Sequence, residues 1–215
     1  DDIKKFWPEK APDINIVQKY VSKYEKAKIV IKYGGNVLID RKVFNNFIAD
    51  IDVLNKLGLS IIVVHGGGPR IKRELDKKKI ITKFISGLRV TDKNIIDTVE
   101  EVLIDFNIDI VDSLKKLGSE ATSFHTKTDN IIEVKPERKE LGFVGIPEKI
   151  NINLIEDALS KNKIPIIAPL GLDEKNQTFN INGDTAASAI AKKLKARRLI
   201  LMTNVEGVYD DKKKL

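Results

Sequence analysis

Apolar residues recur along the chain at two spacings that indicate different elements. Residues 28–32 and 60–64 contain short runs of consecutive apolar side chains, which are typical of parallel strands buried on both faces. Between them, residues 40–57 carry apolar side chains at helical spacing, and Gly58 provides a helix end. Because a strand, a helix and a strand follow one another here, the pattern predicts a parallel sheet with right-handed crossovers.

The rest of the chain continues this alternation. One helix should begin at Pro69, since proline is favoured in a first turn, and further helices are predicted at residues 13–26, 92–117, 153–161 and 183–195. The remaining apolar runs predict hairpin material between 131 and 150, and strands at residues 120–124, 164–168 and 198–202. The predicted fold class is therefore α/β, with an open, mainly parallel sheet sandwiched between helices in three αβα layers.

The first predicted helix follows an irregular arm formed by residues 1–12. One of its faces carries an apolar stripe, made of Ile16, Val17, Tyr20, Val21 and Tyr24. This stripe either packs against its own domain or, where exposed, forms a surface for self-association.

Composition narrows the functional classes. With 215 residues, 42% of them hydrophobic, the chain can bury a sizeable core. Its net charge of +7 comes from 38 basic and 31 acidic residues that are intermixed, which favours a solvated surface over a nucleic-acid site. No apolar run reaches the roughly 18 residues of a membrane span. We therefore expect a soluble, cytoplasmic protein with neither a nucleic-acid nor a membrane partner.

Cysteine and histidine usage limits the metal and redox chemistry. The chain has no cysteine, so disulfides and thiolate metal sites are excluded, and its two histidines cannot form a multi-histidine centre. No metal held by the protein alone is predicted. Both ends look cut, because the chain starts with Asp1 rather than methionine and stops at Leu215 just after a strand.

Two glycine-rich segments follow the first two predicted strands. Residues 32–36 read Lys-Tyr-Gly-Gly-Asn, and they suit either a tight turn or an anion site to which Lys32 adds a positive charge. Residues 65–69 read His-Gly-Gly-Gly-Pro. Three consecutive glycines are costly in a plain connector, so here an anion site at a helix N-terminus is favoured. His65 is expected to be structural.

Three further polar segments come next to predicted elements. Arg89 precedes a helix and has the planar fork that binds carboxylates, although a lone arginine is more often a surface residue. Residues 180–187 place two asparagines, a glycine and an aspartate before an alanine-rich helix, which exceeds what a helix cap requires. Residues 201–209 form a strand that enters a polar loop. The last two segments suit a ligand crevice at the carboxyl ends of parallel strands.

Taken in order, these segments resemble one known family. Lys-x-Gly-Gly, His-Gly-Gly-Gly-Pro, Gly-Leu-Arg-Val-Thr, Gly-Phe-Val-Gly, Asn-Ile-Asn-Gly-Asp-Thr-Ala-Ala and Thr-Asn-Val-Glu-Gly-Val together resemble the acetylglutamate kinases of the amino acid kinase superfamily. The resemblance implies ATP-dependent phosphorylation of the γ-carboxylate of N-acetyl-L-glutamate in arginine biosynthesis. It also implies an open eight-stranded sheet. The chain then divides into an arm with an interlinking helix (1–26), an amino-acid lobe (27–170) and an incomplete ATP lobe (171–215).

The resemblance also implies roles for particular residues. Lys32 and Asp184 would be catalytic, with Lys32 on the transferring phosphoryl group and Asp184 orienting it. The substrate would be held by four residues: Gly67, Gly68, Arg89 and Asn180. A glutamate side chain has a pKa of about 4.3 and is already ionised at neutral pH, so the reaction needs charge neutralisation rather than a general base.

The nucleotide is implied to be ATP with Mg²⁺, the metal being held mainly by the nucleotide. The residues that would border it are Lys32, Gly34, Gly35, Thr203, Asn204, Gly207 and Tyr209. A second phosphate-contacting lysine of the family lies beyond Leu215, so the ATP site is expected to be incomplete in this chain. Asn204 replaces a common aspartate, and residues 105–109 and 124–129 replace glycine-containing stretches of the family.

Two alternative functions stay open, and the resemblance also bears on the oligomeric state. One alternative is a related kinase acting on an aminoadipate derivative or on glutamate, and the other is a non-catalytic, arginine-binding kinase-like domain. Members of the family that are inhibited by L-arginine carry an N-terminal helix like residues 13–26. By this resemblance we expect a homo-oligomer in which dimers assemble into a hexamer, and we expect L-arginine to inhibit it.

Overall fold

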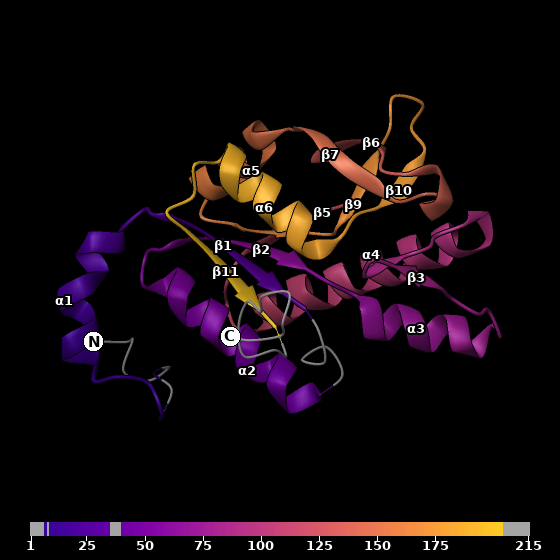
Figure 1. Cartoon of the computed structure of the whole chain (residues 1–215). Coiled ribbons are helices and arrows are strands. Elements are labelled where there is room, and N and C mark those ends of the chain that lie inside the picture. Colours follow the sequence, from indigo (N-terminus) through magenta and orange to yellow (C-terminus); the bar gives the residue numbers. More distant parts are fainter. Residues whose placement is uncertain (1–6, 8, 35–39, 204–215) are drawn as a thin grey trace, which may run out of the picture.

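The computed structural model describes residues 7, 9–34 and 40–203. At its centre lies a five-stranded sheet in the order β11-β1-β2-β8-β5, in which every neighbouring pair is parallel (Figure 1). These strands are β1 (Lys28–Tyr33), β2 (Ser60–His65), β5 (Ala121–Phe124), β8 (Ile164–Ile167) and β11 (Arg198–Met202). The predicted α/β fold class with a mainly parallel sheet is confirmed. In the described residues this sheet has five strands rather than the eight that the resemblance implied.

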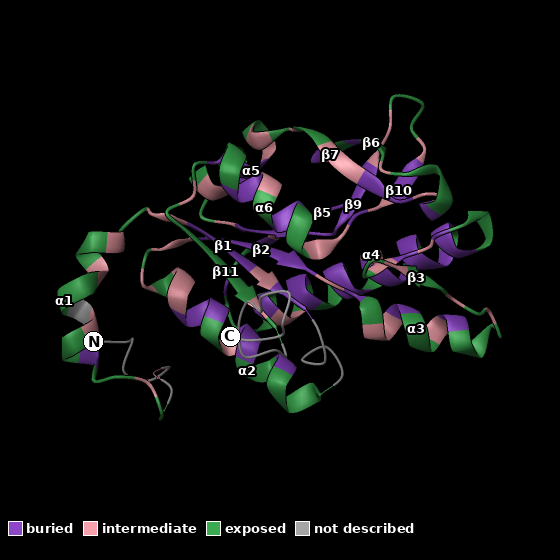
Figure 2. Cartoon of the chain, viewed as in Figure 1, coloured by how far each residue is buried: buried purple, intermediate pink, exposed green. Residues whose placement is uncertain are grey.

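Helices cover both faces of the sheet, and the alternation of side chains along the strands explains why. On β1, Ile29 and Ile31 point to the face covered by α2 (Arg41–Lys56) and α4 (Lys93–Lys116). Val30 points to the opposite face, which is covered by α5 (Ile152–Ser160) and α6 (Gly183–Lys193). Figure 2 shows the resulting buried layer along the sheet, with exposed residues on the outer sides of the helices.

Four helices, α1 (Ile14–Tyr24), α2, α4 and α6, begin where a side-chain cap accepts from free backbone N–H groups. Asp40 accepts from Lys42 N at 2.7 Å to start α2, and Asp92 accepts from Asn94 N at 2.8 Å to start α4. Pro69 lies in the first turn of α3 (Gly68–Lys77). These starts agree with the predicted ones to within a residue or two.

A second sheet lies on the side of α5 and α6, in the order β10-β9-β6-β7. The predicted hairpin is its antiparallel pair of β6 (Ile132–Pro136) and β7 (Gly145–Ile150). The other two strands, β9 (Leu170–Leu172) and β10 (Thr178–Asn180), were not predicted. Each is only three residues long, too short for a pattern of alternating side chains to emerge.

A two-stranded hairpin, β3 (Phe84–Ile85) with β4 (Leu88–Arg89), also escaped prediction. Its turn consists of Ser86 and Gly87, which have φ angles of 50° and 79°. Positive φ at both central positions is typical of tight hairpin turns. The hairpin brings Arg89 to the end of a strand rather than leaving it in an irregular stretch.

The N-terminal helix α1 (Ile14–Tyr24) lies at one end of the molecule (Figure 1). Its C-terminal Tyr24 lies beside the start of β11, with the guanidinium carbon of Arg197, the residue before that strand, 4.3 Å from the ring centroid and that of Arg198 5.9 Å from it. On the apolar stripe, Ile16 is 57% and Tyr20 54% exposed. The apolar stripe is therefore only partly covered by the rest of this chain.

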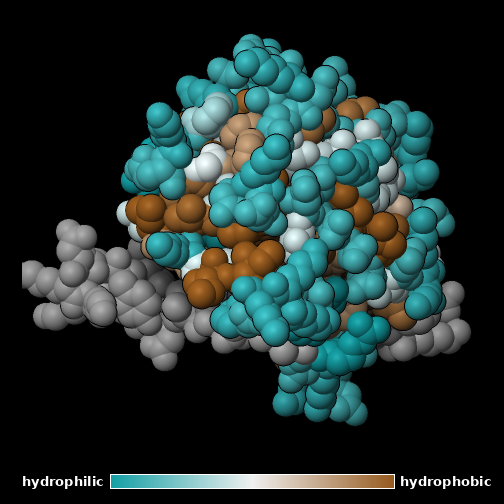
Figure 3. Space-filling view, turned by 90° about the vertical axis from the view of Figure 1, so that its right-hand side faces the viewer, coloured by the Kyte–Doolittle hydropathy of each residue, from teal (hydrophilic) through white to brown (hydrophobic). Residues whose placement is uncertain are grey.

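Among the described residues, no helix combines the length and the apolar character needed to cross a membrane. Hydrophilic side chains cover most of the face shown in Figure 3, and apolar residues form smaller groups between them.

Candidate functional site

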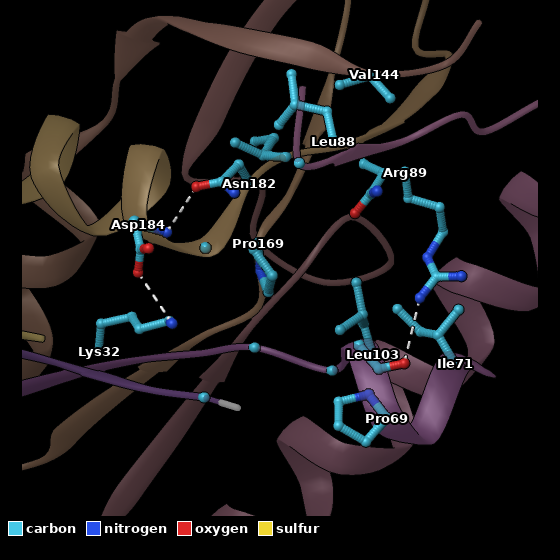
Figure 4. A pocket seen from close by; sticks show the side chains of 18 of the residues that line it. Lys32, Pro69, Ile71, Leu88, Arg89, Leu103, Val144, Pro169, Asn182 and Asp184 are labelled. Carbon is cyan, nitrogen blue, oxygen red and sulfur yellow. Dashed lines mark hydrogen bonds and ion pairs between the residues drawn. The ribbon is translucent and has the colours of Figure 1, made fainter. Parts of the chain in front are cut away.

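A cavity of about 230 Å³ opens at the carboxyl ends of β1 and β2 (Figure 4). Its walls come from the glycine loop after β2, the β3–β4 hairpin, β10 and the start of α6. Ligands of open α/β sheets bind at the carboxyl ends of their strands. The volume lies below the roughly 300–1,000 Å³ of drug-sized sites, so it suits a small metabolite.

One side of the cavity holds an ion pair between Lys32 and Asp184. The two atoms, Lys32 Nζ and Asp184 Oδ1, are 2.9 Å apart. Lys32 extends from β1 on the face covered by α6, while Asp184 lies in the first turn of α6, whose N-cap is Asn182. A carboxylate in a first helical turn also interacts favourably with the helix dipole, so α6 fixes the group against which the lysine is held.

The glycine loop forms the floor next to this pair. A methyl group on the Cα of Gly67 would lie 2.3 Å from Cδ2 of Leu103, closer than any side chain tolerates. Gly67 and Gly68 line the cavity, and α3 begins at Gly68 with free N–H groups in its first turn. On the other side of Lys32, a methyl group on Gly34 would lie 2.6 Å from the ammonium nitrogen. Both loops therefore bring bare backbone into the site.

Arg89 lies on the opposite side of the cavity from Lys32 (Figure 4). The residue is only 8% exposed, and burial lowers the pKa of its guanidinium, which a more distant Asp76 partly offsets. Its guanidinium donates to Thr82 Oγ1 at 3.1 Å and to Gly68 O at 3.3 Å, and it faces the ring of Phe84. No carboxylate lies within ion-pair distance of it in the part of the chain that the structure describes. A buried, permanently charged fork with donors to spare indicates an anionic ligand.

Asn180 lines the cavity from β10 and is tied to the arginine through Thr91. Its side-chain nitrogen is 3.4 Å from Thr91 Oγ1, and that hydroxyl donates to Arg89 O at 2.9 Å. The backbone N–H of Asn180 donates to Phe143 O at 2.9 Å. The amide of Asn180 is thus held on the same side of the site as Arg89.

The nucleotide-side predictions are only partly covered by the described residues. Gly35, Asn204, Gly207 and Tyr209 lie outside them. Thr203 follows β11 and is exposed, and β11 pairs with β1 so that Leu201 is opposite Lys32. The carboxyl end of β11 therefore points to the same edge of the sheet as the lysine.

Sequence reasoning missed the apolar walls of the cavity, which include Ile71, Phe84, Leu103, Val144 and Pro169. Ile71 and Leu103 lie at core positions of helices, where a lining residue has no distinct sequence signal. Phe84 lies on the unpredicted β3.

Residues 124–129, which the resemblance marked as a departure from the family, contact a buried carboxylate. Glu100 on α4 accepts hydrogen bonds from Thr126 Oγ1 at 2.5 Å and from Thr178 Oγ1 at 2.7 Å, and Lys127 Nζ lies 3.0 Å away. Burial raises the pKa of Glu100, but these contacts outweigh it, so the pKa lies below its usual value. The group ties β10, which carries Asn180, to α4. No group of three or more metal-ligating side chains occurs within the described ranges.

A model of one protein family, described as "Amino acid kinase family", matches residues 27–215. The "Acetylglutamate kinase" of Pelagibacter ubique is 52% identical over 208 residues, which cover 97% of this chain and 72% of the relative. Further curated proteins with that name match over nearly the whole chain.

Solved structures agree with the fold. A Streptococcus mutans protein, smu.665, has a TM-score of 0.78 at 32% identity and covers 86% of this chain and 76% of its own. An N-acetylglutamate synthase from Neisseria gonorrhoeae, solved with coenzyme A and N-acetylglutamate, has a TM-score of 0.80 at 20% identity, over 95% of this chain and 49% of its own. At that identity the second match bears on the fold alone.

Proposed function

The chain belongs to the amino acid kinase family, and from this premise we propose that it transfers the γ-phosphoryl group of ATP to the γ-carboxylate of N-acetyl-L-glutamate, a phosphotransfer to a carboxyl group, as an acetylglutamate kinase of arginine biosynthesis. One observation carries the choice of substrate. A single small cavity has the ammonium of Lys32 on one side and the buried guanidinium of Arg89 on the other. N-acetylglutamate has two carboxylates separated by a short chain, so each can face one of these cations.

We assign the ends of the substrate accordingly. The α-carboxylate binds Arg89, whose planar fork matches two carboxylate oxygens. Asn180, held close to Arg89 through Thr91, hydrogen-bonds to the acetylamino group. The γ-carboxylate then reaches the glycine loop, where the amides of Gly67 and Gly68 hold it. The apolar walls, including Leu103, contact the methylene groups between the two ends.

The chemical step requires neutralisation of negative charge. An oxygen of the γ-carboxylate forms a bond to the γ-phosphorus, while the bond from that phosphorus to the bridging oxygen of ATP breaks, leaving ADP and an acyl phosphate. Charge spreads over the equatorial oxygens in this transition state. Lys32 stabilises that charge, and Asp184, 2.9 Å away, holds the lysine in place. No proton has to move, because the carboxylate is ionised at neutral pH.

On the nucleotide side, ATP lies over the C-terminal lobe (171–215) and the amino acid over residues 27–170. Gly34, Gly35, Thr203, Asn204, Gly207 and Tyr209 border the nucleotide in this proposal. Mg²⁺ neutralises phosphate charge and is held mainly by the nucleotide, as is usual for a cation that binds through few carboxylates and substrate phosphates. The exposed end of β11 beside β1 supports this placement.

Assembly and regulation are proposed from α1. Its exposed Ile16 and Tyr20 suit pairing with a second copy across a two-fold axis. We propose a cytoplasmic homo-oligomer, dimers joined into a hexamer by α1, which L-arginine inhibits at a site bounded by this helix.

The test of the activity is hydroxylamine trapping of the acyl phosphate formed by the full-length protein. With Mg-ATP and N-acetyl-L-glutamate we expect a hydroxamate in proportion to ADP. Hydroxamate only with aminoadipate derivatives or with glutamate would favour the related kinase. No hydroxamate with any of them, together with L-arginine binding, would favour the non-catalytic domain.

A further inference from the structure

A series of hydrogen-bonded polar groups, two of them fully buried, lies next to the glycine loop. Ser123 Oγ donates to Asn107 Oδ1 at 2.5 Å, and Asn107 Nδ2 lies 3.0 Å from Ile166 O and 3.1 Å from His65 Nε2. The other ring nitrogen, His65 Nδ1, is 2.9 Å from Gly66 O. His65 and Asn107 are fully buried and lie outside the cavity lining. Neither group takes part in the mechanism above.

The carbonyl acceptors in this hydrogen-bonded series determine which atoms donate and which accept. A backbone carbonyl such as Ile166 O only accepts, so the atom of Asn107 that faces it is the amide nitrogen. That nitrogen donates to His65 Nε2, which must then be unprotonated. The ring proton therefore resides on Nδ1 and is donated to Gly66 O. Burial also lowers the pKa of His65 to about 4, so the neutral ring persists at physiological pH.

This hydrogen bond determines which way one peptide group points. In a trans peptide the C=O and N–H groups point in opposite directions, and the structure describes no cis peptide bond. With Gly66 O directed at His65, the N–H of Gly67 is directed away from it, toward the cavity that Gly66 to Gly68 line. The N–H of Gly66 is fixed as well, since it donates to Tyr33 O at 2.6 Å. Gly67 N–H has no hydrogen-bond partner among the described residues.

We propose that His65 and Asn107 are positioning residues that hold the Gly66–Gly67 peptide with its N–H presented to the anionic group in the cavity. Two adjacent glycines have the widest backbone freedom, so little else opposes a flip of this peptide. A flipped peptide would direct a carbonyl oxygen at the anion and turn an attraction into a repulsion. The identity of that anion, the γ-carboxylate of N-acetylglutamate, rests on the proposed function. The buried asparagine that supports His65 comes from α4, a different element from the glycine loop that it helps to hold.

A pair of nearly isosteric substitutions separates positioning from mere core packing. His65→Asn places an amide N–H near the position of Nδ1, whereas His65→Leu fills a similar volume without a donor. Leu114→Ala, a buried position on the same helix as Asn107 and remote from the cavity lining, controls for loss of stability alone.

The experiment measures the Kd of N-acetyl-L-glutamate by calorimetry for the full-length wild type and the three variants, with Tm recorded for each. We expect His65→Leu to bind at least about tenfold more weakly than His65→Asn, as for the loss of a hydrogen bond to a charged group. Leu114→Ala should lower Tm with an unchanged Kd. Equal affinity of the Asn and Leu variants would overturn the proposal.

A second measurement on the wild type alone keeps this inference separate from the proposed function. Ring ¹⁵N shifts of His65 at neutral pH should report a neutral ring protonated on Nδ1. A ring protonated on Nε2, or a charged ring, would overturn the positioning role whether or not the protein binds N-acetylglutamate. If the wild type fails to bind this ligand while the ring is protonated on Nδ1, the substrate assignment fails and the peptide orientation stands.

Discussion

Lys32 and Asp184 form a contact of 2.9 Å in which the two partners differ sharply in exposure: the lysine is 13% exposed and the aspartate 55%. The lysine is therefore held within the site, whereas its partner remains in contact with water. An aspartate placed in this way orients an ammonium group without having to accept a proton from a substrate.

Replacing Lys32 should affect the chemical step more than substrate binding. For Lys32→Met in the full-length enzyme we expect kcat to fall roughly 100-fold or more, because a charge that stabilises the transition state is removed. The KM for N-acetylglutamate should change much less. Hydroxamate kinetics measure both. Lys28→Met is the matched control, since Lys28 lies on the same strand and pairs with Glu156 away from the cavity. An equal loss of kcat in both variants would remove Lys32 from the catalytic step.

Arg89→Lys should show the opposite split. Lysine keeps the positive charge but loses the bidentate fork, so KM for N-acetylglutamate should rise several-fold or more, with a smaller change in kcat. Arg73→Lys, at an exposed position of α3, is the control and should behave as the wild type. An unchanged KM in Arg89→Lys would place the α-carboxylate elsewhere.

Gly67→Ala tests the close approach of the glycine loop to α4. A methyl group there would meet Leu103 at 2.3 Å, while one on Gly68 would meet nothing within 4 Å. We expect Gly67→Ala to lower the free energy of unfolding by about 1–3 kcal/mol, as for overpacking. Urea unfolding of Gly67→Ala, with Gly68→Ala as its control, checks this. Adding Leu103→Ala to Gly67→Ala should relieve the clash, so the double variant should lose less free energy of unfolding than the two single variants lose together. An equal or greater loss would contradict the explanation.

Stability should depend on pH through the two buried histidines. Burial lowers the pKa of His65 to about 4 and that of His125 below its ordinary value. Between these values and about 6.5, the pKa of an unperturbed histidine, the unfolded chain binds protons that the folded chain does not. The free energy of unfolding should therefore fall as pH decreases from about 6.5 toward 4, by up to about 1.4 kcal/mol per pH unit from His65, and His125 contributes in the same direction. Urea titrations at pH 7, 5.5 and 4.5 measure the slope.

Since the chain has only two histidines, His65→Asn should flatten part of this slope, and His65→Asn with His125→Asn most of it. A double variant with an undiminished slope between pH 6.5 and 4.5 would assign the effect to other groups.

The proposed ring rests on the exposed half of α1. Ile16→Glu with Tyr20→Glu places charges on the two exposed apolar positions, and we expect light scattering to show dimers in place of hexamers. Arginine inhibition should weaken in parallel while activity persists. Lys19→Glu on the same helix is exposed and serves as the control for charge alone. An intact protein that is already dimeric would exclude the ring.

Elements with many residues could be predicted from the sequence because their spacing repeats. The strand at β1 and the helix α4 were placed within a residue of their observed bounds. The short strands β4 and β10 were missed, although they carry Arg89 and Asn180. β4 pairs with β3 and β10 with β9 across short connections, and two or three residues are too few for alternating apolar and polar positions to appear.

The same limit applies to the candidate site, where clusters of unusual composition can be recognised in the sequence and isolated residues cannot. Glycine loops and polar clusters have a signal of their own, and the structure brings Lys32 and Asp184 into contact. Asn107 has no such signal, because a single asparagine in a helix resembles any surface residue. Its role depends on the carbonyl of Ile166 and the ring of His65, which only the folded sheet brings to it.

The order of the parallel sheet has a consequence for how the protein is made. β1 pairs with β2, its neighbour along the chain, and with β11, which is synthesised much later. While the ribosome makes the intervening segments, β1 is an open edge with unpaired backbone groups, the kind of edge on which chains aggregate. Closure of that edge requires contact between distant parts of the sequence, which is a slow class of folding event. β1, the strand that carries Lys32, is thus paired on both edges only after β11 has been made, so a newly made chain gains the geometry around Lys32 only when this edge is closed.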